Sequence, residues 1–131
     1  MSFVFDAEAL LAFYLGEPRG RAVQKLLDEV VKRKARGYLN IVNLTELYYI
    51  LYRRSPALAK EKERNLRAYG IDVVPVNDET LWREAARTKG EHALSLADAF
   101  AAATAKAKNA TLLIGRDIEF DDLDIPIKRI S

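Results

Sequence analysis

Apolar and polar positions follow two patterns along the chain, and each pattern predicts a different element. Short apolar runs rich in β-branched and aromatic residues predict strands buried on both faces, at residues 3–5, 38–42, 71–76, 111–117 and 125–130. Between them, apolar residues at helical spacing predict helices at residues 7–14, 19–35, 43–54, 56–68, 80–89 and 95–108. This alternation indicates the α/β class, with a mostly parallel central sheet and helices on both faces.

Glycine, proline and capping residues set the expected boundaries of these elements. Gly37 is the expected stop after the second helix, and Asn43 is the expected cap of the third. Pro56 is expected to begin the fourth helix, and Gly70 to end it. Pro75 places the third strand near an edge of the sheet, because proline cannot donate a hydrogen bond to a neighbouring strand.

The composition excludes several kinds of site. The chain has 131 residues, half of them hydrophobic, which suits one domain spanning residues 1–131. With no cysteine and one histidine, thiolate sites, histidine-rich zinc sites and Ser-His-Asp triads are disfavoured. Any metal ion would be held by oxygen, which Mg²⁺ and Mn²⁺ prefer. No run nears the roughly 18 apolar residues of a membrane span and no signal-peptide pattern opens the chain, so we expect a cytoplasmic protein.

The positive charge is mild and partly clustered. A formal net charge of +2 and a pI near 8.9 permit nucleic-acid binding without requiring it. Four cations follow the apolar stripe of the second predicted helix, namely Lys32, Arg33, Lys34 and Arg36. They either complement the negative end of the helix dipole or contact RNA, and the sequence leaves both interpretations open.

Four acidic residues occupy comparable positions in the predicted fold. Asp6 and Asp117 follow strands directly, whereas Glu46 and Asp98 lie in the first turns of helices. Ligand clefts of open α/β sheets lie beyond the carboxyl ends of the strands, which Asp6 and Asp117 would reach directly. The sequence does not fix where the two helical acids lie relative to that cleft.

Three of these acids also have a structural interpretation. Asp6 is a good N-cap, because its oxygen can accept from the free N–H groups of the following turn. Glu46 and Asp98 each lie three residues after a capping residue, Asn43 and Ser95, which is the spacing of a capping box. Capping and metal binding can both be true of the same carboxylate.

Electrostatics constrains any cluster of these acids. If the four carboxylates met at about 5 Å, each ionised pair would repel by roughly 3 kcal/mol at an effective dielectric constant near 20. Such a cluster needs protonation or a cation. A bound Mg²⁺ or Mn²⁺ ion would remove the conflict, polarise a phosphoryl oxygen and lower the pKa of a bound water. The acids therefore predict metal-assisted hydrolysis that needs no histidine.

The residues around the four acids resemble the motifs of a known family. The segments 3–6, 43–47, 95–100 and 112–120 resemble the four acidic motifs of PIN domains, in the same order and at suitable separations. Among PIN domains, the chain most resembles the VapC-type toxins of prokaryotic type II toxin–antitoxin pairs. The resemblance covers essentially the whole chain, and it implies a three-layer α/β/α fold with a parallel sheet.

The same resemblance implies a function. It implies a Mg²⁺- or Mn²⁺-dependent endoribonuclease that cleaves RNA phosphodiester bonds with a metal-activated water. It gives the catalytic and metal-binding roles to Asp6, Glu46, Asp98 and Asp117. A homodimer or higher homo-oligomer and an antitoxin protein are the implied partners. A non-catalytic RNA-binding or assembly module of the same fold, and a housekeeping RNA-processing nuclease, remain alternatives. A phosphohydrolase with an aspartate nucleophile is disfavoured, because the segment 6–8 lacks the usual second aspartate.

Some residues depart from the family pattern or keep two interpretations. Gly115 stands where the last motif commonly has Thr or Ser, so a hydroxyl is missing there. Arg116 is a candidate phosphate contact and Glu119 a candidate auxiliary ligand, although both could be ordinary surface charges. His92, in an expected loop, is interpreted as solvated rather than as a general base. The three tyrosines of the third predicted helix pack in the core or form a partner interface, namely Tyr48, Tyr49 and Tyr52.

Overall fold

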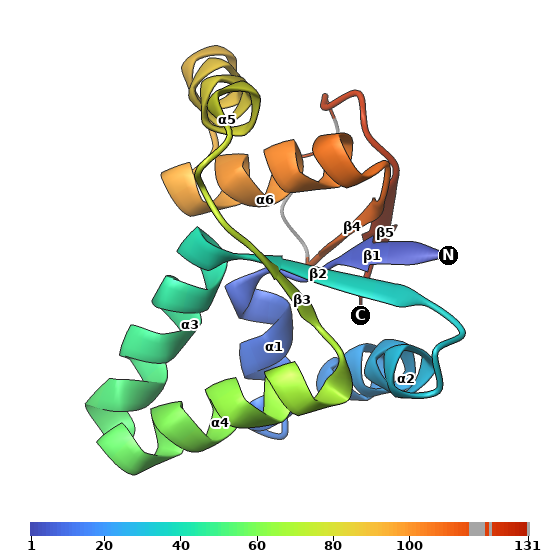
Figure 1. Ribbon diagram of the computed structural model, residues 1–131, viewed down its shortest axis with the longest axis vertical. Helices are drawn as coiled ribbons and strands as arrows, with labels where there is room; N and C mark the ends of the chain where they lie inside the picture. Colours follow the sequence, from blue (N-terminus) through green and yellow to red (C-terminus); the bar gives the residue numbers. More distant parts are fainter. Residues whose placement is uncertain (116–119, 121, 131) are drawn as a thin grey trace.

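The chain folds around a parallel sheet whose central strand comes first in the sequence (Figure 1). The structure is a computed structural model that describes residues 1–115, 120 and 122–130. Within these residues the sheet has the strand order β3-β2-β1-β4-β5, and every neighbouring pair is parallel. The strands are β1 (Ser2–Val4), β2 (Arg36–Asn40), β3 (Asp72–Val74), β4 (Thr111–Ile114) and β5 (Ile127–Arg129). The predicted parallel sheet and the edge position of β3 are confirmed.

Six helices in the described residues cover both faces of the sheet, so the predicted α/β/α layering is confirmed (Figure 1). One face is covered by α1 (Ala7–Tyr14), α2 (Gly20–Val31), α3 (Ile41–Arg54) and α4 (Pro56–Tyr69). The other is covered by α5 (Glu79–Glu91) and the alanine-rich α6 (Leu96–Lys108). None of the described helices is both long enough and apolar enough to cross a membrane.

The central strand shows why both faces need covering. Phe3 and Phe5 point into the core that also contains Leu39 and Leu113, beneath α1 to α4. Val4, between them, points into the opposite core with Leu112, beneath α5 and α6. All three side chains of this run are buried, which explains why the strand is apolar throughout rather than alternating with polar residues.

The order of the strands creates a switch point beside β1. From β1 the chain first builds outward through β2 and β3, and then returns to the other side of β1 to add β4 and β5. Connections therefore leave the carboxyl ends of β1 and β4 in opposite directions, and this is where open α/β sheets form ligand clefts. Asp6 follows β1 at this point.

The expected start of α3 is wrong by two residues. Asn40 rather than Asn43 caps the helix, and its side chain accepts a hydrogen bond from the Val42 backbone N–H at 2.8 Å. Ile41 and Val42 are β-branched and resemble a continuing strand, but the cap turns the chain before them. The capping-box interpretation of Glu46 is therefore wrong, because Asn43 lies inside the helix.

The predicted stop at Gly37 is also wrong. Helix α2 ends at Val31, and Arg33 follows in the left-handed region with φ of 60°. Gly37 instead lies within β2, where a Cβ atom would come within 2.7 Å of Ile71 Cδ1. Close packing explains this glycine. The predicted limits of α4, by contrast, are confirmed to within one residue, with Pro56 at its start and a left-handed Gly70 after its last residue.

Candidate active site

Asp6 is a buried carboxylate at the carboxyl end of the central strand. Its Oδ1 accepts a hydrogen bond from the Ala9 backbone N–H at 2.8 Å, which confirms its predicted role as the cap of α1. Burial raises the pKa of Asp6 to about 7. The Ala9 hydrogen bond opposes this rise, while the carboxylates of Glu8, Asp98 and Glu46 add to it. Capping accounts for one carboxylate oxygen but not for the concentration of negative charge.

Glu46 lies beyond the first turn of α3 and is half-buried. Its pKa is raised by burial first, and then by the charges of Asp98 and Glu8. One turn earlier, the fully buried Asn43 donates from Nδ2 to the Ala97 backbone oxygen at 3.0 Å. This hydrogen bond joins α3 to the first turn of α6, so it holds Glu46 and Asp98 on neighbouring helices.

Asp98 belongs to the first turn of α6 and is also half-buried. The Ser95 hydroxyl oxygen accepts from the Asp98 backbone N–H at 3.1 Å, so Ser95 caps the helix as predicted. The charge of Asp98 raises the pKa of both Asp6 and Glu46. Three helices thus bring the acids Asp6, Glu46 and Asp98 into electrostatic range of one another, while Asp117, Arg116 and Glu119 lie outside the described residues.

Glu8 is a fourth acid of this cluster, although no role in the site was predicted for it from the sequence. It lies two residues after Asp6 in α1, and its charge raises the pKa of both Asp6 and Glu46. It also forms an ion pair with Arg19, with 2.7 Å between Arg19 Nη1 and Glu8 Oε1. Its proximity to Asp6 in the sequence was a usable signal. Its pairing with Arg19 was not readable, because the two residues meet only through the packing of α2 on α1.

The donor set suits a hard cation in its chemistry. All the ligands offered are carboxylate oxygens, and the raised pKa of Asp6 shows that burial, and then the neighbouring acids, disfavour its ionised form in the absence of a counter-charge. Among the described residues, however, no three acidic or histidine side chains are already arranged around one ion position. The acids therefore have the oxygen ligands that such an ion prefers, but the described side chains do not form a coordination shell around one position.

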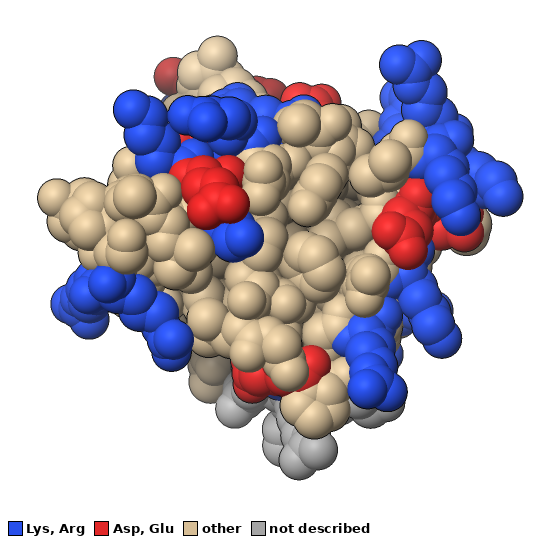
Figure 2. Space-filling model, turned by 90° about the horizontal axis from the view of Figure 1, so that it is seen from below, with Lys and Arg blue, Asp and Glu red and all other residues tan. Residues whose placement is uncertain are grey.

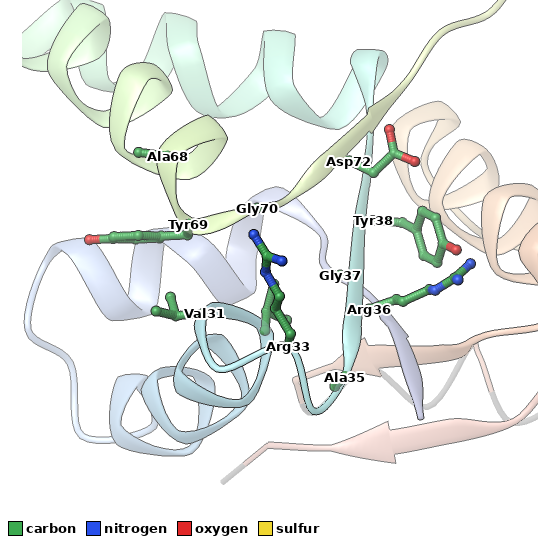
Figure 3. Close-up of a pocket in the computed structure, with 11 residues that line it drawn as sticks. Val31, Arg33, Ala35, Arg36, Gly37, Tyr38, Ala68, Tyr69, Gly70 and Asp72 are labelled. Carbon is green, nitrogen blue, oxygen red and sulfur yellow. The ribbon is translucent and has the colours of Figure 1, made fainter.

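A pocket in the described part of the molecule lies away from the acids. It has a volume of about 500 Å³ and sits at the amino ends of β2 and β3, between the last turns of α2 and α4 (Figure 3). Figure 3 shows Arg33 reaching into it beside Tyr69, while Arg36 and Asp72 lie along its strand side. Because parallel strands share one direction, this pocket and the acid cluster occupy opposite ends of the sheet.

Comparison with known proteins identifies the family. The sequence model of the PIN domain matches residues 3–126, which is nearly the whole chain. The chain belongs to the PIN domain family. This confirms the resemblance drawn from the four acidic motifs. No curated protein sequence matches the chain significantly.

Solved structures with the same PIN fold include several toxin–antitoxin complexes. A chain of VapBC2 from Rickettsia felis bound to promoter DNA has a TM-score of 0.77 and 16% identity, and the match covers 100% of both chains. DNA-bound VapBC from Salmonella typhimurium has a TM-score of 0.74 and 15% identity, with 98% of both chains covered. FitAcB from Neisseria gonorrhoeae has a TM-score of 0.69 and 20% identity, with 95% of both covered. At these identities the likeness establishes the fold.

Proposed function

We propose that this PIN domain is a Mg²⁺- or Mn²⁺-dependent endoribonuclease and the toxin of a toxin–antitoxin pair. The observation that carries the proposal is the gathering of Asp6, Glu46 and Asp98 beside the switch point of the sheet, with a buried Asp6 whose pKa is raised to about 7. Strongly perturbed carboxylates grouped at a cleft position mark functional sites more often than structural ones. Membership of the PIN family supports nuclease activity and divalent-metal use.

Each residue of the cluster has a definite task in this proposal. Asp6, Glu46 and Asp98, together with the predicted ligand Asp117, would hold the metal ion. A bound divalent ion would supply electrophilic assistance to the phosphate and an activated water. The Ala9 hydrogen bond fixes one oxygen of Asp6, so the carboxylate keeps a single orientation. Asn43 holds α3 against α6, which keeps Glu46 and Asp98 on the same side of the cluster.

The same proposal includes partners and location. Structural neighbours at similar chain length are toxins solved in VapBC and FitAB complexes, which supports an antitoxin partner for this chain. Tyr49 and Tyr52 are exposed on α3, 46% and 53% respectively, and this supports a partner or dimer surface there. Tyr48, by contrast, packs against the core. A cytoplasmic, single-domain protein is consistent with this role.

RNA cleavage by purified protein tests the proposal. Wild-type protein is expected to cut single-stranded RNA with Mn²⁺ or Mg²⁺ and to lose activity in chelator, while Asp6→Asn lowers the rate by about 100-fold or more. Asp72→Asn is the matched control, because Asp72 is an exposed aspartate at the opposite end of the sheet. Cleavage that survives both the chelator and Asp6→Asn would exclude the mechanism. Metal-independent RNA binding without cleavage would instead favour a non-catalytic module.

A further inference from the structure

We propose that Arg19 is a phosphate-binding residue of the active site. Its ion pair with Glu8 orients it, and the lack of a side chain at Gly115 leaves the space that it occupies. Its ligand is a backbone phosphate of single-stranded RNA next to the phosphate that is cleaved. This inference rests on the proposed ribonuclease function and adds a cationic contact to a site otherwise built from acids. Three structural observations support it.

The backbone of Arg19 is fixed close to the acid cluster. Arg19 immediately precedes α2, and the next residue, Gly20, packs so tightly on α1 that a Cβ atom would lie 2.5 Å from the Ala12 backbone oxygen. Helix α2 therefore begins in direct contact with the helix that carries Asp6 and Glu8. From this position the Arg19 side chain reaches Glu8, whose charge acts on both Asp6 and Glu46.

Gly115 provides the space that the guanidinium occupies. Gly115 is buried and directly follows β4, on the other side of the switch point from Asp6. A Cβ atom at this position would lie 2.9 Å from Arg19 Nη1 and 2.9 Å from Glu8 Oε1. With the Thr or Ser that PIN motifs commonly have here, the ends of the Arg19 and Glu8 side chains would therefore have to shift from these positions. The glycine at position 115 therefore allows the Arg19–Glu8 ion pair to occupy this place.

The guanidinium has hydrogen-bonding capacity beyond this ion pair. One donor, Nη1, is hydrogen-bonded to Glu8, while Nη2 forms a longer ion pair with Glu17 Oε1 at 3.7 Å, beyond hydrogen-bond distance. An arginine offers five N–H donors in a planar fork that matches a phosphate. Because the side chain is only 25% exposed, its attraction for an anion is screened less than that of a fully solvated arginine.

A purely structural role explains the arrangement less well. Glu8 is 45% exposed, and ion pairs of this kind contribute typically less than about 1 kcal/mol to stability. That small gain does not account for a buried arginine stem, a glycine at position 115 and an adjacent cluster of acids. The Arg19 cation, by binding a phosphate, would offset part of the repulsion between RNA and the neighbouring carboxylates.

RNA affinity can be measured separately from cleavage. A fluorescent single-stranded RNA is titrated into Asp6→Asn protein, which is expected to bind without cutting, and its dissociation constant is measured at several salt concentrations. Adding Arg19→Ala is expected to weaken binding about 10-fold and to reduce the slope of log K against log salt by about 0.7, the value for one lost phosphate contact. Arg19→Lys should retain the salt slope and lose part of the affinity. Arg21→Ala, an exposed arginine on the same helix, is the control and should change the affinity less than 2-fold.

Cleavage kinetics then separate this inference from the proposed function. In the otherwise wild-type protein, Arg19→Ala is expected to raise KM about 10-fold with a smaller loss of kcat, and to leave the thermal unfolding temperature nearly unchanged. Gly115→Ser should give the same change in KM, because its side chain displaces the ion pair. If the wild-type protein cleaves RNA while Arg19→Ala alters neither KM nor the salt slope, the inference is wrong and the ribonuclease function stands. If the wild-type protein neither cuts nor binds RNA, both are wrong.

Discussion

The two ends of the sheet differ in the groups that they carry: one end has acids with raised pKa values, and the other has a pocket bordered by arginines. At the carboxyl end, burial and the charges of neighbouring acids raise the pKa of Asp6 and of Glu46. At the amino end, a pocket of about 500 Å³ is bordered by Arg33, Arg36 and Asp72. The difference teaches that buried carboxylates with raised pKa values are better evidence of an active site here than the presence of a pocket.

The face of the molecule below the sheet shows how the surface cations are distributed (Figure 2). Seen from below, the face formed by α4 and its neighbours shows Lys and Arg around its margins, with acidic groups among them and a broad neutral area in the middle (Figure 2). Cations are therefore dispersed on this face rather than gathered into one continuous path for nucleic acid. Arg19 is a different case, because it is held next to the acids by an ion pair.

Neutralising single acids at the carboxyl end of the sheet should have the largest effect on activity. Glu46→Gln and Asp98→Asn are expected to lower RNA cleavage by about 100-fold or more, because each removes a proposed metal ligand. Arg36→Ala, at the pocket, should change it less than 3-fold. Initial rates with saturating Mn²⁺ compare the three variants. Equal losses at both ends would show that the amino-end pocket belongs to the functional site.

Stability should respond in the opposite sense to activity at Asp6. Its pKa in the folded state, about 7, lies above the ordinary aspartate value of 3.8, so the folded state binds more protons than the unfolded state between these pH values. Metal-free stability is therefore expected to fall as pH rises from about 4 to about 7, by at most about 4 kcal/mol. Asp6→Asn keeps an oxygen for Ala9 and cannot ionise, so it should be more stable than wild type at pH 8. Urea unfolding in chelator at pH 5 and pH 8 measures both effects. A wild type that is equally stable at both pH values would contradict the raised pKa.

Metal binding should stabilise the protein only when the acids at the carboxyl end of the sheet are intact. Mn²⁺ at about 100 times its dissociation constant is expected to stabilise the wild-type protein by roughly 2.7 kcal/mol. The same addition should leave Asp6→Asn nearly unchanged, while Asp72→Asn should respond like wild type. Thermal unfolding with and without Mn²⁺ measures the shift. A full shift in Asp6→Asn would place the ion elsewhere.

The smallest effects are expected at the amino end itself. Arg33→Gly should alter stability by less than about 1 kcal/mol, because it removes an exposed charge while glycine adopts the left-handed conformation of position 33 more readily. The change in RNA affinity distinguishes the two interpretations of the Lys32–Arg36 cations. An unchanged affinity favours the helix-dipole interpretation, and a loss of several-fold would extend the RNA path to this end.

Much of the fold could be predicted because single residues determine local boundaries. Pro75 indicated an edge strand, and Pro56 with Gly70 delimited α4, since each acts through its own backbone. The start of α3 could not be predicted in the same way. Asn40 was concealed in an apolar run, and it is also held by a hydrogen bond from its Nδ2 to Thr104 Oγ1 at 2.9 Å, a contact between distant segments.

In the candidate site too, some residues could be predicted from the sequence, while others depend on contacts between distant segments. The grouping of Asp6, Glu46 and Asp98 was predicted from the resemblance to the PIN motifs, because the strand ends alone place only Asp6 among these three, and their metal-binding roles stay predictions. Glu8 and Arg19 were not assigned, because their pairing depends on how closely α2 approaches α1 at Gly20. Position 115 was recognised as a departure, and only the structure supplies its steric reason.

The pairing of β1 with β4 has a consequence for how the protein is made. It joins residues near the two ends of the described chain, Phe3 with Thr111 and Val4 with Leu112. During synthesis the central strand leaves the ribosome well before its second neighbour, β4, which follows about 100 residues later. Contacts between such distant residues also form late in folding, because closing long loops is entropically unfavourable. The carboxyl ends of β1 and β4 therefore come together only after residues 111–114 have been synthesised, so a chain truncated before β4 is expected to be inactive.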